Sequence, residues 1–498
     1  MRGWVGLLVV SSVLLWFSNL GTAFTVTIGL KGEPNTLDPH RVVGRQSEAF
    51  LANIFDGLTS RDETGKVLPG LAVSWEAVDP YTWRFYLRKG VKFHNGELFT
   101  AESVKFTIER AQNPAQKATT WAQLGPIHNV IIIDDFTVDI ITTEPDILIP
   151  MRLGDLFGAM LPPQYTKEAG DSFGEKPIGT GPFRLVEWIK NERLVLEANK
   201  DYWRGAPAVD RVIVRPIPED ATRVAALLAG EVDLIDAIPY AMKNVIEKLR
   251  EFSILPVSTT RVMYVALDPK TPPLDDVRVR QALNYAIDRK TIIDRLYLGE
   301  ARPAATIVAQ EAWGFDPSIE PYPYDPEKAR ALLAEAGYPN GFEIEFDYFT
   351  GSIVDHYSPA LAVIGYLTNI GVKVKANVYE FGVFSQKRVA NLAAPMYIYS
   401  LGDVFFEPVW LIEWLMAGDM SRRYDNPEVR DLVKQIKATF DPQARLPLYK
   451  RVQELMKEDA QHIFLFQIKV LWGVNKQRIT YTPRPDDVVW LYSIKPTL

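Results

Sequence analysis

The sequence contains no cysteine among its 498 residues. Disulfide bonds, cysteine nucleophiles and the lipid-modified cysteine of a bacterial lipoprotein are therefore excluded. Stability has to come from the hydrophobic core, and the chain is too long for one core, so two or three lobes are expected. A composition of 47% apolar and 23% charged residues is typical of a packed globular protein.

Clusters of positive charge are also missing. The 55 Lys and Arg residues are spread along the chain and are outnumbered by 62 Asp and Glu, which gives a formal net charge of −7. A nucleic-acid-binding surface gathers Lys and Arg in one patch. We therefore expect no nucleic-acid partner.

Catalytic and cofactor motifs are absent as well. The five histidines form no H-E-x-x-H motif, and neither Gly-x-Ser-x-Gly nor a phosphate-binding loop occurs. Gly179-Thr180-Gly181 lacks the third glycine of a dinucleotide site and is typical of a turn. His94 lies in a predicted turn and is not expected to bind metal. No cofactor and no metal are predicted, whereas a glycosidase-like carboxylate pair across a cleft stays open.

The N-terminus has the pattern of a secretory signal peptide over residues 1–23. Arg2 supplies positive charge, Trp4–Phe17 is almost wholly apolar, and Gly21 and Ala23 are small residues at a cleavage point. The apolar run is shorter than the roughly 20 residues of a membrane span. We expect cleavage after Ala23 and a soluble periplasmic protein that is not a lipoprotein; retention of the segment as an anchor is the alternative.

Strand and helix patterns alternate through the rest of the chain. Residues 25–30 and 82–88 alternate with period two, and residues 127–141 predict a hairpin that turns at Asp134-Asp135. Thr100 is placed to cap a helix. The sequence predicts an α/β fold with mixed sheets flanked by helices.

The clearest helix signals lie in the middle of the chain. Asp325 is a helix cap, Pro326 takes the first helical position, and Gly337 ends the helix. Residues 342–378 then predict a strand, a helix over 354–370 and a second strand, which together form a β-α-β unit.

Several ordered segments resemble one protein family, the extracellular solute-binding proteins of ABC importers that include bacterial oligopeptide-, dipeptide- and nickel-binding proteins. The resemblance covers essentially the whole chain after residue 23. It is carried by the segments 35–40, 71–75, 82–96, 99–104, 179–183, 199–203, 228–233, 277–283, 329–333 and 426–429.

This resemblance implies a periplasmic-binding-protein-like fold, in which two lobes close like a Venus flytrap and a third domain is inserted. It places domain I at 24–58, 162–258 and 481–498, domain II at 59–161, and domain III, the second lobe, at 259–480. Trp75, Trp83 and Phe85 belong to the family signature in domain II. They share a strand face, which favours a role in the core of domain II and not in binding.

The resemblance also indicates where a ligand binds. Peptide-binding members carry an aspartate that pairs with the peptide's α-amino group at the position of Asp403. A buried ammonium needs such a charged acceptor, although Asp403 could instead cap a turn. Those members also have a tryptophan three residues earlier, and Ser400 stands there, which weakens the case for a peptide.

Further candidates surround this anchor. Trp410 and Trp414 share a helix face and could stack on a ligand or pack in the core. Tyr399 and Glu407 are binding candidates close to Asp403. Arg41 and Arg45 lie in the loop after the first strand, which lines the cleft in the family, and either could receive a carboxylate or remain solvated.

The sequence thus predicts a non-enzymatic receptor of an ABC importer that captures peptides or similar-sized solutes between two lobes. Oligosaccharide or opine-like cargo is the runner-up. A monomer is expected to deliver the cargo to an ABC permease in the inner membrane. The alternatives are a periplasmic hydrolase, which would convert its substrate, and a signalling or chaperone-like module, which would expose apolar surface outside the cleft.

Overall fold

The computed structural model describes residues 23–42, 45–154, 157–352, 354–417 and 424–497. The predicted signal peptide lies outside this part of the chain, apart from its last residue, and stays a prediction. Within the described ranges, no helix combines the length and the apolar character that a membrane span requires.

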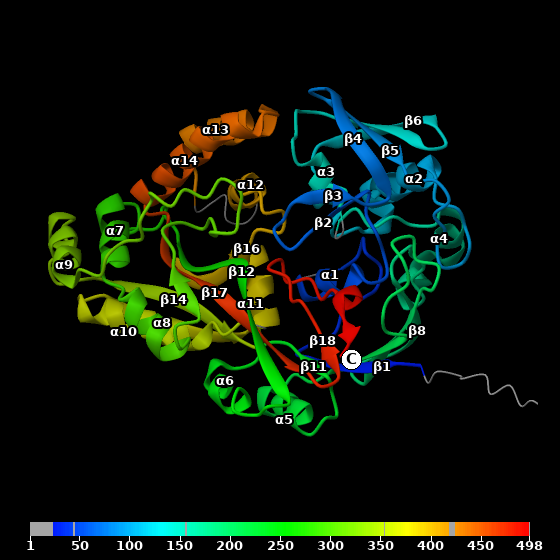
Figure 1. Ribbon diagram of the computed structural model, residues 1–498. Coiled ribbons are helices and arrows are strands. Elements are labelled where there is room, and N and C mark those ends of the chain that lie inside the picture. Colours follow the sequence, from blue (N-terminus) through cyan, green and yellow to red (C-terminus); the bar gives the residue numbers. More distant parts are fainter. Residues whose placement is uncertain (1–22, 43–44, 155–156, 353, 418–423, 498) are drawn as a thin grey trace, which may run out of the picture.

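Two lobes lie side by side in Figure 1, and one 11-stranded mixed sheet runs through both of them. The order of its strands is β15-β14-β16-β12-β17-β11-β1-β10-β9-β8, and β13 pairs with β17. The bounds of these strands are β1 Thr25–Leu30, β8 Phe183–Ile189, β9 Arg193–Ala198, β10 Arg211–Pro216, β11 Leu234–Ile235, β12 Phe252–Leu267, β13 Ala301–Pro303, β14 Glu343–Thr350, β15 Lys373–Glu380, β16 Met396–Gly402 and β17 His462–Asn475.

Helices flank the sheets, as the alternating sequence pattern predicted. Their bounds are α1 Arg45–Leu51, α2 Ala101–Gln112, α3 Ile149–Arg152, α4 Pro163–Ala169, α5 Asp220–Leu228, α6 Tyr240–Ile246, α7 Val277–Tyr285, α8 Arg289–Leu296, α9 Pro326–Glu335, α10 Tyr357–Asn369, α11 Phe381–Val389, α12 Val409–Ala417, α13 Pro427–Ala438 and α14 Pro442–Glu458. The predicted α/β fold with two lobes and mixed sheets is confirmed.

We call β1, β8–β11, α1, α4–α6 and residues 476–497 the first lobe, and β13–β16 with α7–α14 the second lobe. The short strands β18 (Ile479–Thr480) and β19 (Lys495–Pro496) pair with each other and belong to the first lobe. Each lobe buries its own apolar side chains, including Val26 and Ile28 in the first lobe and Phe346 in the second. Two separate cores follow from the length of the chain.

A small third domain with a four-stranded sheet stands above the first lobe in Figure 1. Its strands are β4 Ala72–Asp79, β5 Thr82–Leu87, β7 Thr137–Thr142 and β6 Ile127–Asp134, in that order across the sheet, beside the hairpin of β2 Thr59–Arg61 and β3 Val67–Pro69. Trp83 and Phe85 are buried in its core, and Trp75 packs against them. The prediction that the signature aromatics build this core is confirmed, as are the 127–141 hairpin and the helix that Thr100 begins.

The predicted β-α-β unit of the second lobe is confirmed by the parallel strands β14 and β15 and the intervening helix α10. Asp325 caps α9 by accepting a hydrogen bond from the Lys328 N–H. Helix α10 begins at Tyr357 and not at the predicted residue 354. The carboxylate of Asp355 accepts the Tyr357 and Ser358 N–H groups, which fixes the first turn there.

Strands β12 and β17 connect the lobes. Strand β17 pairs with β11 of the first lobe and with β13 of the second, and β12 pairs with β17 and with β16 of the second lobe. Gly473 of β17 pairs with Ile235 of β11 in the first lobe. At the other end of the β12–β17 pair, residues 261–267 of β12 pair with β16 of the second lobe. The β12–β17 register breaks between Ser258 and Val262. Such an irregularity bends a strand. The predicted domain boundaries stay a prediction, and the one at residues 258 and 259 coincides with this bend.

Candidate functional site

A cavity of about 410 Å³ lies where the two lobes face each other. The first lobe lines it with residues that include Glu33, Phe50 and Asp487, and the second lobe with residues that include Tyr399 and Ser400. Arg261 of the connecting strand β12 also lines it. Ligand sites in proteins are concave, mostly apolar with a few polar groups, and about 300–1,000 Å³ in volume. We therefore take this interlobe cavity as the candidate binding site.

The cavity continues toward the edge of the lobes. A neighbouring hollow of about 390 Å³ shares Val354, His356 and Val470 with it as lining residues. Tyr240, which also lines that hollow, stacks edge-on against Tyr297 of the second lobe. The binding space is therefore an elongated groove between the lobes.

One wall of the cavity is polar. It contains Ser400, which stands where the peptide-binding members of the family have a tryptophan. The Ser400 Oγ lies 2.9 Å from the Nε2 of His356, and the other ring nitrogen lies 2.9 Å from the Val354 carbonyl. Burial lowers the pKa of His356 to about 3, so the ring is neutral. A carbonyl only accepts, so Nδ1 donates to Val354 and Nε2 accepts from the Ser400 hydroxyl.

Asp403 lies just beyond the end of β16, three residues after Ser400, and its side chain is buried. Its Oδ1 accepts a hydrogen bond of 2.9 Å from the Phe405 N–H, and its Oδ2 has no hydrogen-bond partner among the described residues. Burial raises the pKa of Asp403 to about 7, and the nearby carboxyl of Glu407 adds to the rise. Asp403 is therefore a buried acid whose charge is poorly compensated.

Glu407 and Trp410 follow Asp403 but already have partners. The Tyr449 hydroxyl donates to Glu407 Oε1 at 2.5 Å, and the Arg445 Nε lies 3.3 Å from the same oxygen. The Trp410 indole donates to the Gln123 Oε1 at 3.1 Å, and its ring packs against Phe405 in the core. Neither side chain lines the interlobe cavity.

Of the six predicted binding residues, Tyr399 lies in the wall of the cavity. Arg41 is directed elsewhere: it pairs with Asp171 at 2.7 Å and donates to the Gln116 carbonyl at 3.0 Å. Arg45 begins α1, but its side chain lies outside the described residues. The structure thus places Tyr399 in the cavity wall and Asp403 four residues further along the chain, outside the cavity lining, and Arg41 lies apart from both.

Sequence reasoning missed several residues of the cavity wall, among them Arg261, His356, Trp472 and Asp487. These residues come from segments that lie far apart in the sequence. Arg261 sits in a strand pattern without any local break that would mark the bend between the lobes. Only Ser400 carried a signal, because it replaces the tryptophan that the resemblance implies.

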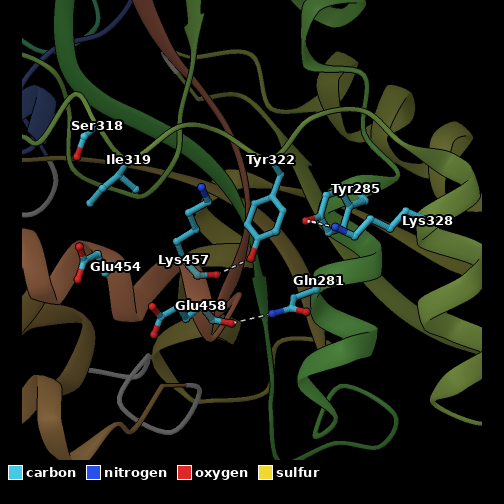
Figure 2. A pocket seen from close by; sticks show the side chains of 9 residues that line it. All are labelled: Gln281, Tyr285, Ser318, Ile319, Tyr322, Lys328, Glu454, Lys457 and Glu458. Atoms are coloured by element: carbon cyan, nitrogen blue, oxygen red, sulfur yellow. Dashed lines mark hydrogen bonds between the residues drawn. The ribbon is translucent and has the colours of Figure 1, made fainter.

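A separate cavity of about 430 Å³ lies within the second lobe and shares no lining residue with the interlobe cavity (Figure 2). Its polar groups bond to one another. Tyr322 donates to the Lys457 carbonyl at 2.5 Å, Gln281 to the Glu458 carbonyl at 3.0 Å, and Lys328 to the Tyr285 hydroxyl at 2.8 Å. These bonds join α7, α9 and α14, and so this cavity is a joint between helices.

Within the described ranges, no group of three or more His, Asp or Glu side chains is placed to hold a metal ion. The arrangement is suited to holding a guest by shape and charge.

Comparison with known proteins also indicates a solute-binding protein. Residues 66–421 match the family model described as "Bacterial extracellular solute-binding proteins, family 5 Middle". The chain is 30% identical over 469 residues to the glutathione-binding protein GsiB of Pectobacterium atrosepticum, and the match covers 91% of this chain and 90% of that protein.

Two solved structures share the fold. The periplasmic binding protein DppA of Helicobacter pylori, in complex with the peptide STSA, is 26% identical with a TM-score of 0.85, covering 95% of this chain and 98% of that one. The binding protein AgaA of A. tumefaciens R10, in complex with agropinic acid, is 27% identical with a TM-score of 0.83, covering 95% and 99%.

These relatives bind solutes for transport and are not enzymes, so the alternative of a periplasmic hydrolase falls away. The family model spans most of the chain, and the fold places a cavity between two lobes joined by two strands. The chain belongs to the bacterial extracellular solute-binding proteins of family 5 and is a binding protein, not an enzyme.

Proposed function

We propose that this protein is the periplasmic receptor of an ABC importer and that its cargo is a short peptide or a peptide-like solute. In this proposal the segment 1–23 directs export and is removed. The receptor then acts as a monomer and hands its cargo, chemically unchanged, to a permease in the inner membrane. The peptides bound by GsiB and DppA, the named relatives, support this class of cargo.

The observation that carries the proposal is the cavity enclosed by two lobes that only β12 and β17 join within the main sheet. Bending at the irregular register of β12 would open the cavity, and closure would shield the cargo from water. Exclusion of water strengthens each charge contact with the cargo. A receptor that must both hold and release a solute needs this combination.

We further propose that Asp403 receives the α-ammonium group of the cargo. The carboxyl is buried at the end of β16, next to the cavity-lining residues Tyr399 and Ser400, and its Oδ2 has no partner among the described residues. A cation brought to that oxygen would supply the missing charge and would favour the ionised form. Rotation of the lobes has to bring Asp403 and the cargo together.

An opine-like cargo is the second candidate, and the wall formed by Ser400 and His356 favours it. The serine leaves more room than a tryptophan, and its hydroxyl oxygen can accept a hydrogen bond from a cargo hydroxyl. The likeness to AgaA, which was solved with agropinic acid, is of the same strength as the likeness to DppA.

Native mass spectrometry of the purified protein tests the receptor function directly, because a retained cargo appears as added mass. Titration calorimetry with dipeptides, glutathione and agropinic acid then ranks the cargo classes. For an α-ammonium cargo, Asp403→Asn is expected to weaken binding about 10- to 100-fold, the usual worth of a charged hydrogen bond.

The matched control for Asp403→Asn is Asp294→Asn, which changes an exposed carboxylate on α8. An N-acetylated dipeptide provides the second control, because it lacks the ammonium. If Asp403→Asn bound a free dipeptide as tightly as the unmodified protein does, the role of Asp403 as ammonium anchor would be refuted. Recovery of a cleaved dipeptide after incubation would contradict the receptor function itself.

A further inference from the structure

Arg261 occupies the bend of the strand that joins the lobes. It is the first residue of β12 to pair with β16, opposite Gly402, and it lies at the end of the stretch 259–261 in which the pairing with β17 is interrupted. The hydroxyl of Thr259 accepts the Arg261 N–H at 3.2 Å and donates to the Ile468 carbonyl at 3.1 Å, which fixes this bend. The backbone at Arg261 is therefore held in place, and its side chain lines the cavity.

The guanidinium of Arg261 spans the space between the lobes. It donates to the Ser400 carbonyl of the second lobe at 3.3 Å and to the Asp487 Oδ2 of the first lobe at 2.8 Å. Both partners of this ion pair line the cavity, and their side chains remain 18% and 26% exposed. The pair is therefore accessible to a solute inside the cavity.

The charges of the cavity wall single out Arg261. Among the described lining residues it is the one Arg or Lys, whereas Glu33, Asp236 and Asp487 carry carboxyl groups. His356 is neutral. A carboxylate that enters the cavity is repelled by the acids and is attracted by Arg261, whose fork of N–H groups matches a carboxylate.

Resting on the proposed function, we propose that Arg261 binds a carboxylate of the cargo and that Asp487 is the internal carboxylate which the cargo displaces. The cargo class is thereby narrowed to solutes that bear a carboxylate. Asp487 stands in a left-handed backbone conformation, with φ of 61°, in the segment after Asp486. Its partial exposure allows the displaced side chain to turn toward water.

This exchange gives the receptor a moderate affinity. In the empty protein Arg261 is already paired with Asp487. The binding free energy that the cargo gains is therefore the difference between two similar ion pairs and not the full contribution of one. The bound cargo in turn breaks a link between the lobes, and reforming that link helps to expel it. A receptor that has to release its cargo benefits from such a built-in competitor.

Titration calorimetry of the full protein with Met-Leu and Met-Leu amide, and with glutathione and its glycine amide, tests this proposal. We expect the acids to bind at least about tenfold more tightly than the amides. Asp487→Asn keeps the shape but removes the competitor, and it should tighten acid binding about three- to tenfold. Arg261→Gln should remove the preference for acids over amides.

Arg184→Gln is the matched control, because Arg184 forms an exposed ion pair with Glu197 on the first lobe, outside the cavity wall. Equal binding of acids and amides would refute the Arg261 site and leave the receptor function standing. Tight acid binding that Asp487→Asn leaves unchanged would refute the role of Asp487 as competitor. A protein that neither acids nor amides bind, in any of these forms, would contradict both proposals together.

Discussion

Two buried carboxyl groups of this protein lie in opposite surroundings. Asp38 is 2% exposed and sits between the first lobe and α2, where both of its oxygens accept hydrogen bonds from Arg110, at 3.0 and 2.6 Å. Asp403 is 1% exposed at the end of β16, and its Oδ2 has no hydrogen-bond partner among the described residues.

The pKa values differ accordingly. Burial by itself raises the pKa of Asp38, but the Arg110 guanidinium outweighs burial and holds the pKa below its ordinary value. Burial raises the pKa of Asp403 to about 7, and the charge of Arg61, which lowers this pKa, does not cancel the effect of burial. A compensated charge such as Asp38 stabilises a joint, whereas the poorly compensated carboxyl of Asp403, three residues after the cavity-lining Ser400, is suited to receiving a charged guest.

Removal of the compensating cation at the domain joint has the largest expected effect. Arg110→Met leaves Asp38 buried without its partner and should lower the free energy of unfolding by about 3–5 kcal/mol. Urea unfolding at pH 7 measures this loss. The control Arg184→Met removes an exposed pair and should cost less than about 1 kcal/mol. If the two variants lowered the free energy of unfolding by similar amounts, the buried Arg110–Asp38 pair would stabilise the protein no more than the exposed pair does.

The pH dependence of stability should have opposite signs at the two carboxyls. The raised pKa of Asp403 means that its contribution to stability is full below about pH 4 and is lost as the pH rises to about 7, by at most about 1.4 kcal/mol per pH unit. Asp403→Asn should therefore flatten the decline between pH 4 and 7.

Asp38 provides the matched comparison for this pH series. Its lowered pKa makes its contribution present at neutral pH and lost on acidification, so the destabilisation caused by Asp38→Asn should shrink as the pH falls. Urea unfolding from about pH 2 to pH 8 follows both variants, because the change at Asp38 falls below about pH 4 and the change at Asp403 lies above it. If both variants changed the pH profile in the same direction, the opposite environments of the two groups would be disproved.

The smallest effect is expected at Arg41. Its partner Asp171 is 91% exposed, and exposed ion pairs contribute about 0–1 kcal/mol, whereas its second partner, the buried Asp38, lies 3.7 Å away and is already bound by Arg110. Arg41→Ala should therefore change stability by less than about 1 kcal/mol and leave the dissociation constant of the cargo within about twofold. Calorimetry that found a larger loss of affinity would place Arg41 in the binding site after all.

Local sequence patterns predicted the elements well where near neighbours determine the structure. The cap at Asp325, the hairpin at 127–141 and the parallel β-α-β unit depend on residues close in sequence, and all of them formed. The start of α10 was misplaced by three residues, because apolar periodicity alone did not reveal that Asp355 caps the first turn.

The binding site was predictable only in part. The family resemblance pointed to the segment that ends β16, and Tyr399 and Ser400 of this segment line the cavity. The resemblance offered no sign that Glu407 is paired with Arg445 or that Arg41 faces Asp171. Such pairings depend on which distant segments meet when the chain folds.

The sequence by itself determined the class of protein, through ordered motifs, and most helices and strands, through capping and periodicity that act over a few residues. Only the tertiary structure decided which charges are compensated and which residues share the cavity. Arg261 and Asp487 are separated by 226 residues, and Asp38 and Arg110 by 72. Contacts over such separations arise from the packing of whole lobes, which no local pattern encodes.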